Sequence, residues 1–371
     1  MRHFEPKDIF PEHDMKRLFP LHARGACPAK VVFICVIAIC LCGASTSPRS
    51  LFGQQAPQLQ EPQKKGAAEP EKKPAVKEGK PKEIPPAQDL QLQTKPQGGL
   101  PPINLSCTWL PGMREKETVP VLLVHDWGSS RNGLLALAQH LQKELGCAVL
   151  VPDLRGHGGS TSLVGGGKKL DAKQMNKNEI PFVSEDIEAC KRFLKQRHNA
   201  GELNLEMLTV IACGDSTPLA ATWALADWQW PPYDGIKQGQ DVKLMILLSP
   251  VRKFETLSLL GSVKSPVFSD PRVDGITTVL FWDSSQDASE KEAKAIETVL
   301  VKGFGSNPSS DDPDRWSRIR YSLKVVNNGG YGERLVNGNK SALVKQEITS
   351  FIDQKLASRA EKYPWTDRTD K

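Results

Sequence analysis

Residues 121–128 read Val-Leu-Leu-Val-His-Asp-Trp-Gly, and residues 148–158 read Ala-Val-Leu-Val-Pro-Asp-Leu-Arg-Gly-His-Gly. Each stretch begins with an apolar run and ends in a glycine-containing loop. Between them leucines recur at helical spacing, before Gly146: Leu134, Leu137, Leu141 and Leu145. Apolar strands without polar alternation, separated by a helix, indicate parallel strands that are buried on both faces of a sheet.

The same alternation continues through residues 99–357, which we expect to form one folded domain. Further apolar strands are expected at 208–212, 242–248, 277–282 and 321–326, and an antiparallel strand in front at 103–110. Helices are expected at 183–194 with Ser184 as a cap, and at 219–228, 288–300 and 342–356. This order predicts an α/β fold with a mostly parallel central sheet and helices on both faces. The segment from Pro250 to Asp274 is too short for a large lid domain.

The N-terminal region differs in composition from this domain. Residues 31–44 are an uninterrupted apolar run, flanked by basic residues and followed by small ones. The run has the size of a signal-peptide core and is short for a membrane span, so residues 1–47 are interpreted as a signal peptide or signal anchor. Residues 48–98 are rich in Pro, Gln, Lys and Glu and are expected to be a disordered linker. Residues 358–371 are taken as a C-terminal tail. The protein is therefore expected to be exported (periplasmic or extracellular), or alternatively anchored in a membrane by 31–44.

Composition excludes several other functions. The net charge of +6 is modest and is not concentrated on one expected helix face, which gives no indication of a nucleic-acid partner. Outside the leader, four scattered cysteines form no C-x-x-C pair, so we expect buried thiols and no metal or cofactor: Cys107, Cys147, Cys190 and Cys213. A Cys107–Cys147 disulfide is conceivable in an exported chain. The run from Gly165 to Lys169 lacks the glycine spacing of a P-loop and is read as a surface loop.

Two motifs carry a resemblance to the α/β-hydrolase superfamily. The sequence His125-Asp126-Trp127-Gly128 resembles the family's His-Gly-x-x motif, which precedes one backbone amide of the oxyanion hole. The run from Asp153 to Gly158 resembles the loop after the next strand, which is structural in relatives and in which a catalytic His157 is not expected. Asp126 stands where the family usually has glycine. A carboxylate that faced a developing oxyanion would oppose it, so Asp126 is interpreted as a solvated or salt-bridged residue that points away, with a role in function as the alternative.

The family's nucleophile lies on a strained turn between a strand and a helix, flanked by small residues. Residues 212–218 read Ala-Cys-Gly-Asp-Ser-Thr-Pro and fit this turn in two registers. In the first, Gly214 occupies the nucleophile position, and glycine is the residue that tolerates a strained turn best. In the second, Ser216 is the nucleophile and Pro218 lies near the first helical position, where proline is tolerated. Small flanking residues favour the first register. Cys213 is expected to face away as a buried thiol.

The remaining catalytic positions are also altered. Asp287, with Asp283 as the alternative, matches the family's acid, although either could cap the helix that follows. The run from Asn327 to Glu333 resembles the Gly-Gly-His-Gly loop, with Tyr331 in place of histidine. Tyrosine has an ordinary pKa near ~10, so it cannot accept the serine proton at neutral pH as imidazole does.

The resemblance therefore implies a hydrolase fold whose catalytic set is incomplete. We expect a non-catalytic protein that binds a protein partner or small ligand at the carboxyl ends of the strands. The alternative is a serine hydrolase acting on esters or amides, in which Ser216 works with a non-standard base. In that case the backbone amides after Ser216 and near Trp127 would hold the oxyanion, and Asp287 would serve in an altered base arrangement. Asp215 is a further oxyanion-like position.

Overall fold

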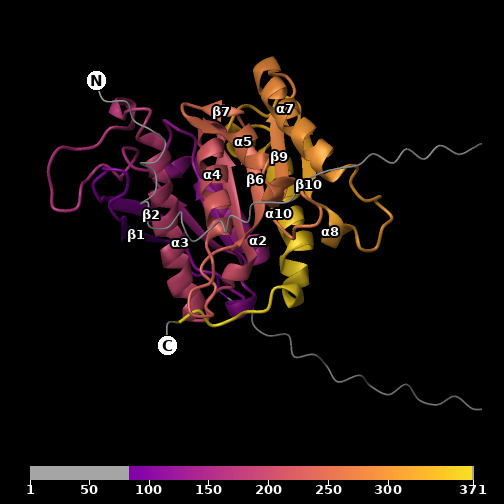
Figure 1. Ribbon diagram of the computed structural model, residues 1–371, viewed down its shortest axis with the longest axis horizontal. Coiled ribbons are helices and arrows are strands. Elements are labelled where there is room, and N and C mark those ends of the chain that lie inside the picture. The colour runs from indigo at the N-terminus through magenta and orange to yellow at the C-terminus, as the bar shows by residue number, and fades with distance from the viewer. Residues whose placement is uncertain (1–82, 370–371) are drawn as a thin grey trace, which may run out of the picture. The chain divides into compact units, whose positions relative to one another are not determined.

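Eight strands form one sheet in the order β1-β2-β4-β3-β5-β6-β9-β10 in a computed structural model that describes residues 83–369 (Figure 1). β1 pairs antiparallel with β2, and β2 pairs antiparallel with β4, whereas all later neighbours are parallel. The strands are β1 (Gln88–Gln93), β2 (Asn104–Leu110), β3 (Pro120–Val124), β4 (Ala148–Pro152), β5 (Leu208–Cys213), β6 (Val242–Leu248), β9 (Thr277–Asp283) and β10 (Tyr321–Val326). A separate hairpin pairs β7 (Lys253–Phe254) with β8 (Leu257–Ser258). The expected mostly parallel α/β sheet is confirmed.

Helices cover both faces of this sheet. They are α2 (Leu135–Leu145), α3 (Ser184–Asn199), α4 (Thr217–Gln229), α5 (Leu259–Val263), α6 (Pro266–Ser269), α7 (Asp287–Phe304), α8 (Arg315–Arg318), α9 (Arg334–Asn337) and α10 (Ser341–Lys355). Short 3-10 turns are η2 (Glu115–Glu117), η3 (Arg131–Leu134), η4 (Ala172–Gln174), η5 (Ile180–Val183), η6 (Leu205–Met207), η7 (Gly214–Ser216) and η8 (Ala357–Lys362). Because η5 leads directly into α3, Ser184 is the first residue of that helix and not its cap.

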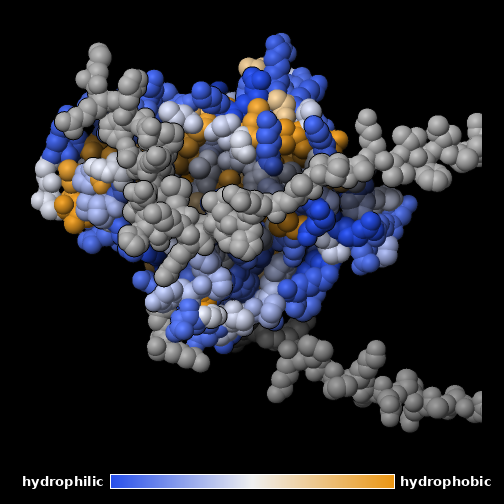
Figure 2. Space-filling view, viewed as in Figure 1, coloured by the Kyte–Doolittle hydropathy of each residue, from blue (hydrophilic) through white to orange (hydrophobic). Residues whose placement is uncertain are grey.

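Two hydrophobic clusters lie on opposite faces of the sheet. α3, α4, α5 and α7 contribute to one cluster, and α2, α9 and α10 contribute to the other. Alternate residues of one strand enter different clusters, as Leu122 and Leu123 of β3 do. Cys107 and Cys147 also fall in different clusters and are free, so the conceivable disulfide is not formed. Figure 2 shows that the outer surface on one side is mainly hydrophilic.

The folded chain extends beyond residues 99–357 at both ends. β1 lies inside the segment expected to be linker, and its Leu90 and Leu92 pack against the core. The glutamines between these leucines give the segment a polar composition, and for this reason the sequence did not indicate a strand there. At the other end, Thr366 accepts a hydrogen bond at 2.7 Å from His198, and Arg368 is buried and pairs with Asp241. The interpretations of residues 1–47 and 48–82 lie outside the described residues. Within 83–369, no helix has the length and apolar character of a membrane span.

Candidate functional site

Loops from four strands meet at the carboxyl-end edge of the sheet. β3 ends before His125, β5 before Gly214, β9 at Asp283, and β10 before the loop that contains Tyr331. Parallel neighbouring strands end at the same edge, and this edge is where open α/β sheets bind ligands. Contacts between these loops show how the expected catalytic positions are arranged, and we call the edge the site rim.

The turn after β5 is centred on Gly214. This glycine has φ +48°, a left-handed conformation that side-chain-bearing residues rarely adopt, and it opens the short η7 that leads into α4. Ser216 follows two residues later, is 0% exposed, and its hydroxyl has no hydrogen-bond partner among residues 83–369. Cys213 is also buried, and burial raises the pKa of its thiol well above the usual value. The strained position of the strand–turn–helix is thus occupied by a residue without a side chain.

The carboxylate of Asp126 lies directly over this glycine. A Cβ atom added to Gly214 would lie 2.3 Å from Asp126 Oδ1. The same oxygen accepts a hydrogen bond from the backbone N–H of Asp215 at 2.7 Å. The expectation that Asp126 points away into solvent or into a salt bridge is wrong. The reason is that the turn leaves an amide and a space with no side chain, and the carboxylate fills both.

The position of Asp126 coincides with the oxyanion hole of this architecture. That hole is built from the amide after the nucleophile and an amide of the loop after β3. Here these amides belong to Asp215 and to Trp127, and hydrogen bonds from both help to stabilise the charged form of Asp126. The carboxylate of Asp126 therefore lies against the amide that the resemblance implies as one donor of an oxyanion hole.

The electrostatics of the rim are unfavourable to a further negative charge. Burial and the neighbouring carboxylates of Asp215 and Glu333 raise the pKa of Asp126 against the effect of the two amides, and the resulting pKa is about 6. Burial and Glu255 also raise the pKa of Asp215. No Lys or Arg of the described chain forms an ion pair with Asp126, Asp215 or Glu333. A developing oxyanion would be repelled here, which is the opposite of what catalysis requires.

Two residues to which the sequence analysis gave no role hold the rim together. Glu333 accepts hydrogen bonds from the Asp126 amide at 3.0 Å and from the Ser129 hydroxyl at 2.6 Å. Ser249, after β6, accepts one from the Gly332 amide at 2.9 Å. These contacts join segments that are 207, 204 and 83 residues apart in the chain. No local pattern could have indicated them, because they depend on which strand ends are neighbours.

Tyr331 occupies the place of the base in the loop after β10. Its side chain is half-buried, and burial followed by the negative charge of Asp126 raises its pKa above the usual value. A phenol with a raised pKa stays protonated at neutral pH and cannot act as a general base. The position therefore lacks the function of a catalytic histidine.

The two candidate acids have different environments. Asp287 is an exposed first residue of α7, with Gln286 at the cap position. Asp283 is 1% exposed and accepts hydrogen bonds from the amides of Asn328 and Gly330, at 3.0 and 2.7 Å, and from Ser285. Burial opposes the charge of Asp283, but these hydrogen bonds outweigh it and lower its pKa. Asp283 thus fixes the backbone of the loop that carries Tyr331, whereas Asp287 does not contact that loop through any hydrogen bond found in 83–369.

The histidines of the two motifs are structural. His125 Nε2 accepts the Leu154 amide at 2.9 Å, while Nδ1 lies 2.8 Å from the carbonyl of Asp126. Burial lowers its pKa to about 4, so it is neutral. His157 Nε2 accepts the Gly128 amide at 2.9 Å, and burial lowers its pKa too. The ring of Trp127 packs edge-on against His157, with centroids 4.8 Å apart. Both imidazoles bind the loop after β3 to the loop after β4.

The described residues offer no alternative metal chemistry. Within 83–369, no group of three or more His, Cys, Asp or Glu side chains has an arrangement that could hold a metal ion. The acidic residues of the site rim are therefore not a recognisable cation site.

Comparisons with known proteins found no match in sequence and several distantly similar solved structures. No family model matches the chain, and no curated protein matches it in sequence. Similar solved structures include a dienelactone hydrolase from Anabaena variabilis, with 12% identity, 73% of this chain and 99% of that chain covered, and a TM-score of 0.48. A hyperthermophilic esterase from Pyrobaculum calidifontis has 13% identity, coverage of 74% and 85%, and a TM-score of 0.49. Esterase 2 from Thermogutta terrifontis has 12% identity, coverage of 74% and 97%, and a TM-score of 0.49.

The strand order and the turn at Gly214 define the class of protein. The chain has a mostly parallel α/β sheet covered by helices on both faces, which is the architecture that the resemblance carried by the motifs at 125–128 and 153–158 implies.

Proposed function

We propose that this protein is a non-catalytic member of the α/β-hydrolase fold that acts by binding. The observation that carries the proposal is the carboxylate of Asp126 over Gly214, bonded to the amide of Asp215. The Asp126 carboxylate thus lies where a nucleophile side chain would be and also fills the oxyanion hole. Tyr331 at the base position removes a third catalytic element.

The alternative, a serine hydrolase that uses Ser216, requires more rearrangement. Ser216 is 0% exposed, lies past the turn tip, and has no hydrogen bond to a base within the described chain. Attack on an ester also requires empty oxyanion donors, and the amide after Ser216, that of Thr217, already donates to the Gly214 carbonyl. Removing one triad member leaves only a small residual activity, and in this register the base is missing.

The test is activity-based labelling of the purified full-length protein. A fluorophosphonate probe and short-chain nitrophenyl esters are applied to the wild type, to Ser216→Ala and to Ser130→Ala, a matched control in the loop after β3. We expect no labelling and no ester hydrolysis above the buffer rate in any variant. Labelling of the wild type and of Ser130→Ala that disappears in Ser216→Ala would establish the hydrolase alternative instead.

We also propose that residues 1–47 direct export and that the domain acts outside the cytoplasm. The support is the apolar run at 31–44 with its basic flank and the small residues that follow. N-terminal sequencing of the protein from its native host separates the two forms of this proposal. A mature chain beginning near residue 48 supports a cleaved signal, whereas an intact leader in the membrane fraction supports an anchor. An intact leader in the soluble cytoplasmic fraction would contradict both.

A further inference from the structure

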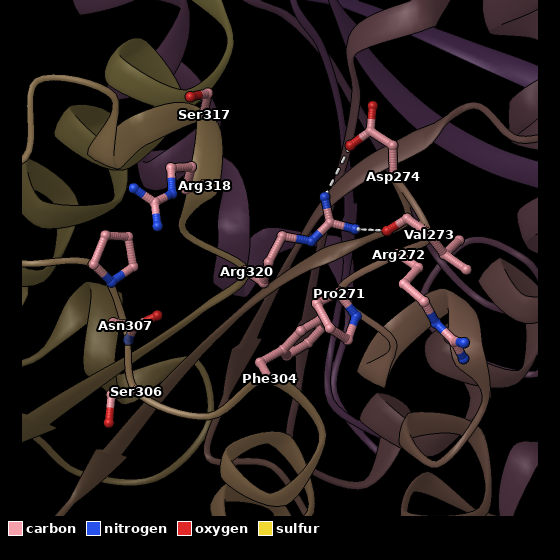
Figure 3. A pocket seen from close by; sticks show the side chains of 11 residues that line it. Pro271, Arg272, Val273, Asp274, Phe304, Ser306, Asn307, Ser317, Arg318 and Arg320 are labelled. Atoms are coloured by element: carbon pink, nitrogen blue, oxygen red, sulfur yellow. Dashed lines mark hydrogen bonds and ion pairs between the residues drawn. The ribbon is translucent and has the colours of Figure 1, made fainter.

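A cavity of about 590 Å³ lies at the opposite edge of the sheet from the site rim, near where β9 and β10 begin (Figure 3). Its walls come from the loop before β9, the end of α7, and the segment that contains α8. The lining residues with charge or an aromatic ring are Arg272, Asp274, Phe304, Arg318 and Arg320. This volume lies within the range of small-molecule sites, roughly 300–1,000 Å³.

A second hollow of about 310 Å³ shares Asp274 with the cavity, and Lys237, Lys243 and Lys362 line it together with Glu206. Across both hollows the lining residues therefore include three arginines and three lysines against two carboxylates, Asp274 and Glu206. Carboxylates outside this lining pair with several of these cations: Asp270 with Arg272, Asp312 with Arg318, and Asp241 with Lys237.

Arg320 is the central cation of the cavity. Its side chain is only 12% exposed, and it donates from Nη1 to Asp274 at 2.9 Å and from Nη2 to the Val273 carbonyl at 2.6 Å. Its buried Nε has no hydrogen-bond partner among residues 83–369. Figure 3 shows the guanidinium directed toward Asp274 and Val273. Arg320 is thus held in place by the backbone while part of its donor capacity is unused.

The carboxylate that neutralises Arg320 is easily displaced. The side chain of Asp274 is 94% exposed, so its ion pair with Arg320 is screened by water and contributes little. Arg272 pairs instead with Asp270, and Arg318 pairs with Asp312. A ligand anion with more charge than Asp274 could replace it without breaking the other pairs.

The cavity also has an apolar wall. Phe304 lines it, and the guanidinium carbon of Arg320 lies 5.8 Å from the centre of the Phe304 ring. Pro271 and Pro308 add further apolar surface. A wall of this kind beside an arginine suits a ligand that joins an anionic group to a planar or apolar body.

Two lysines near the cavity have lowered pKa values, mainly because they are buried. Burial and then Lys237 lower the pKa of Lys243 to about 8, although nearby carboxylates oppose this. Burial and then Arg320 lower the pKa of Lys355, which donates to the carbonyls of Ser317 and Ile319, to about 7.

We propose that this cavity binds a small organic molecule with a tetrahedral oxyanion, a phosphate or sulfate ester. The anionic group takes the place of the Asp274 carboxylate on Arg320, and the organic body packs against Phe304. Because guanidinium matches such oxyanions with two parallel hydrogen bonds, Arg320 sets the position of the ligand. The site lies at the edge away from the rim, so it is independent of the proposed loss of catalysis.

Calorimetric titration of the full-length protein tests this site with phenyl phosphate, phenyl sulfate and inorganic phosphate at fixed ionic strength. We expect phenyl phosphate to bind at least about fivefold more tightly than inorganic phosphate because of the Phe304 wall. Comparison of the phosphate and sulfate esters separates the two sources of the oxyanion. Absence of saturable binding by either ester up to 10 mM would overturn the proposal, and so would equal affinity for phenyl phosphate and inorganic phosphate.

Variants identify the position of binding. Arg320→Gln should weaken phenyl phosphate at least about tenfold, and Asp274→Asn should tighten it about threefold or more, because the competing carboxylate is removed. Asp274→Asn changes an exposed side chain and so keeps the test valid if Arg320→Gln impairs folding. Asp312→Asn, which changes a carboxylate paired with Arg318, is the matched control and should have a smaller effect than Asp274→Asn. Unchanged affinity in Asp274→Asn would contradict displacement of that residue.

Discussion

The carboxylate of Asp126 and the backbone amide of Asp215 form a 2.7 Å hydrogen bond between segments 89 residues apart. This bond places a negative charge above Gly214, where the architecture otherwise holds a nucleophile and an oxyanion. In the proposed non-catalytic function, the loss of a nucleophile side chain and the filling of the oxyanion hole are therefore linked. A side chain at position 214 and the carboxylate at position 126 cannot occupy their places together without a shift of one of them.

This linkage predicts how reactivity could be rebuilt. The double variant Gly214→Ser/Tyr331→His should show no fluorophosphonate labelling, because the new Cβ would meet Asp126 at 2.3 Å and the oxyanion donors would still be filled. Adding Asp126→Gly should give detectable labelling. Mass spectrometry of the labelled protein locates the adduct. Equal labelling of the double and triple variants would contradict a blocking role for Asp126.

The raised pKa of Asp126 predicts a pH-dependent contribution to stability. Its pKa is about 6 in the folded protein against an ordinary 3.8, so the folded state holds the proton more tightly. Stability from this group is complete below about pH 4 and is lost as the pH rises through about 6. Asp126→Asn should therefore gain about 1–2 kcal/mol relative to the wild type between pH 4 and pH 7.5, after allowance for partial exposure. Urea unfolding at both pH values measures this, and a difference independent of pH would contradict it.

Asp283 should be essential for the structure of the Tyr331 loop. Asp283→Ala leaves the amides of Asn328 and Gly330 without their acceptor and should lower the free energy of unfolding by about 2–4 kcal/mol. The exposed Asp287→Ala is the matched control and should change it by less than about 0.5 kcal/mol. Thermal and urea unfolding measure both. Similar losses in the two variants would show that Asp283 does not hold the loop.

Lys355 should produce a second pH effect of opposite sign. Its pKa is lowered from 10.5 to about 7 by burial and by Arg320, with Arg359 and Lys362 adding to the effect and Asp274 opposing it. The unfolded chain then binds more protons between these values, so stability rises with pH in that window. The wild type should gain about 1–2 kcal/mol over Lys355→Met from pH 7 to pH 9.

The exposed Lys302→Met, in the last turn of α7, is the matched control for Lys355 and should show no such change. Urea unfolding of all three proteins at both pH values gives the comparison. A difference between wild type and Lys355→Met that stays constant with pH would contradict the lowered pKa of Lys355.

Fold and site differ in how far they could be predicted. The strands at 119–124 and 148–151 could be predicted because buried parallel strands consist of consecutive apolar residues. β1 was missed because its leucines alternate with glutamines, and the packing of Arg368 was missed because hydrophobicity does not report a buried ion pair. For Asp126 the general electrostatic rule predicted the wrong orientation, since the amide that receives its carboxylate belongs to a distant turn.

The sequence by itself determined the α/β fold, a strand–turn–helix after the strand at 208–212 with Gly214 or Ser216 at its tip, and the tyrosine in place of histidine. These features are local, because periodicity and turn composition depend on neighbouring residues. Only the tertiary structure decided where the carboxylate of Asp126 lies, which acid holds the Tyr331 loop, and that three arginines line a cavity with Phe304. Each of these depends on side chains from strands that become neighbours only when the sheet is assembled.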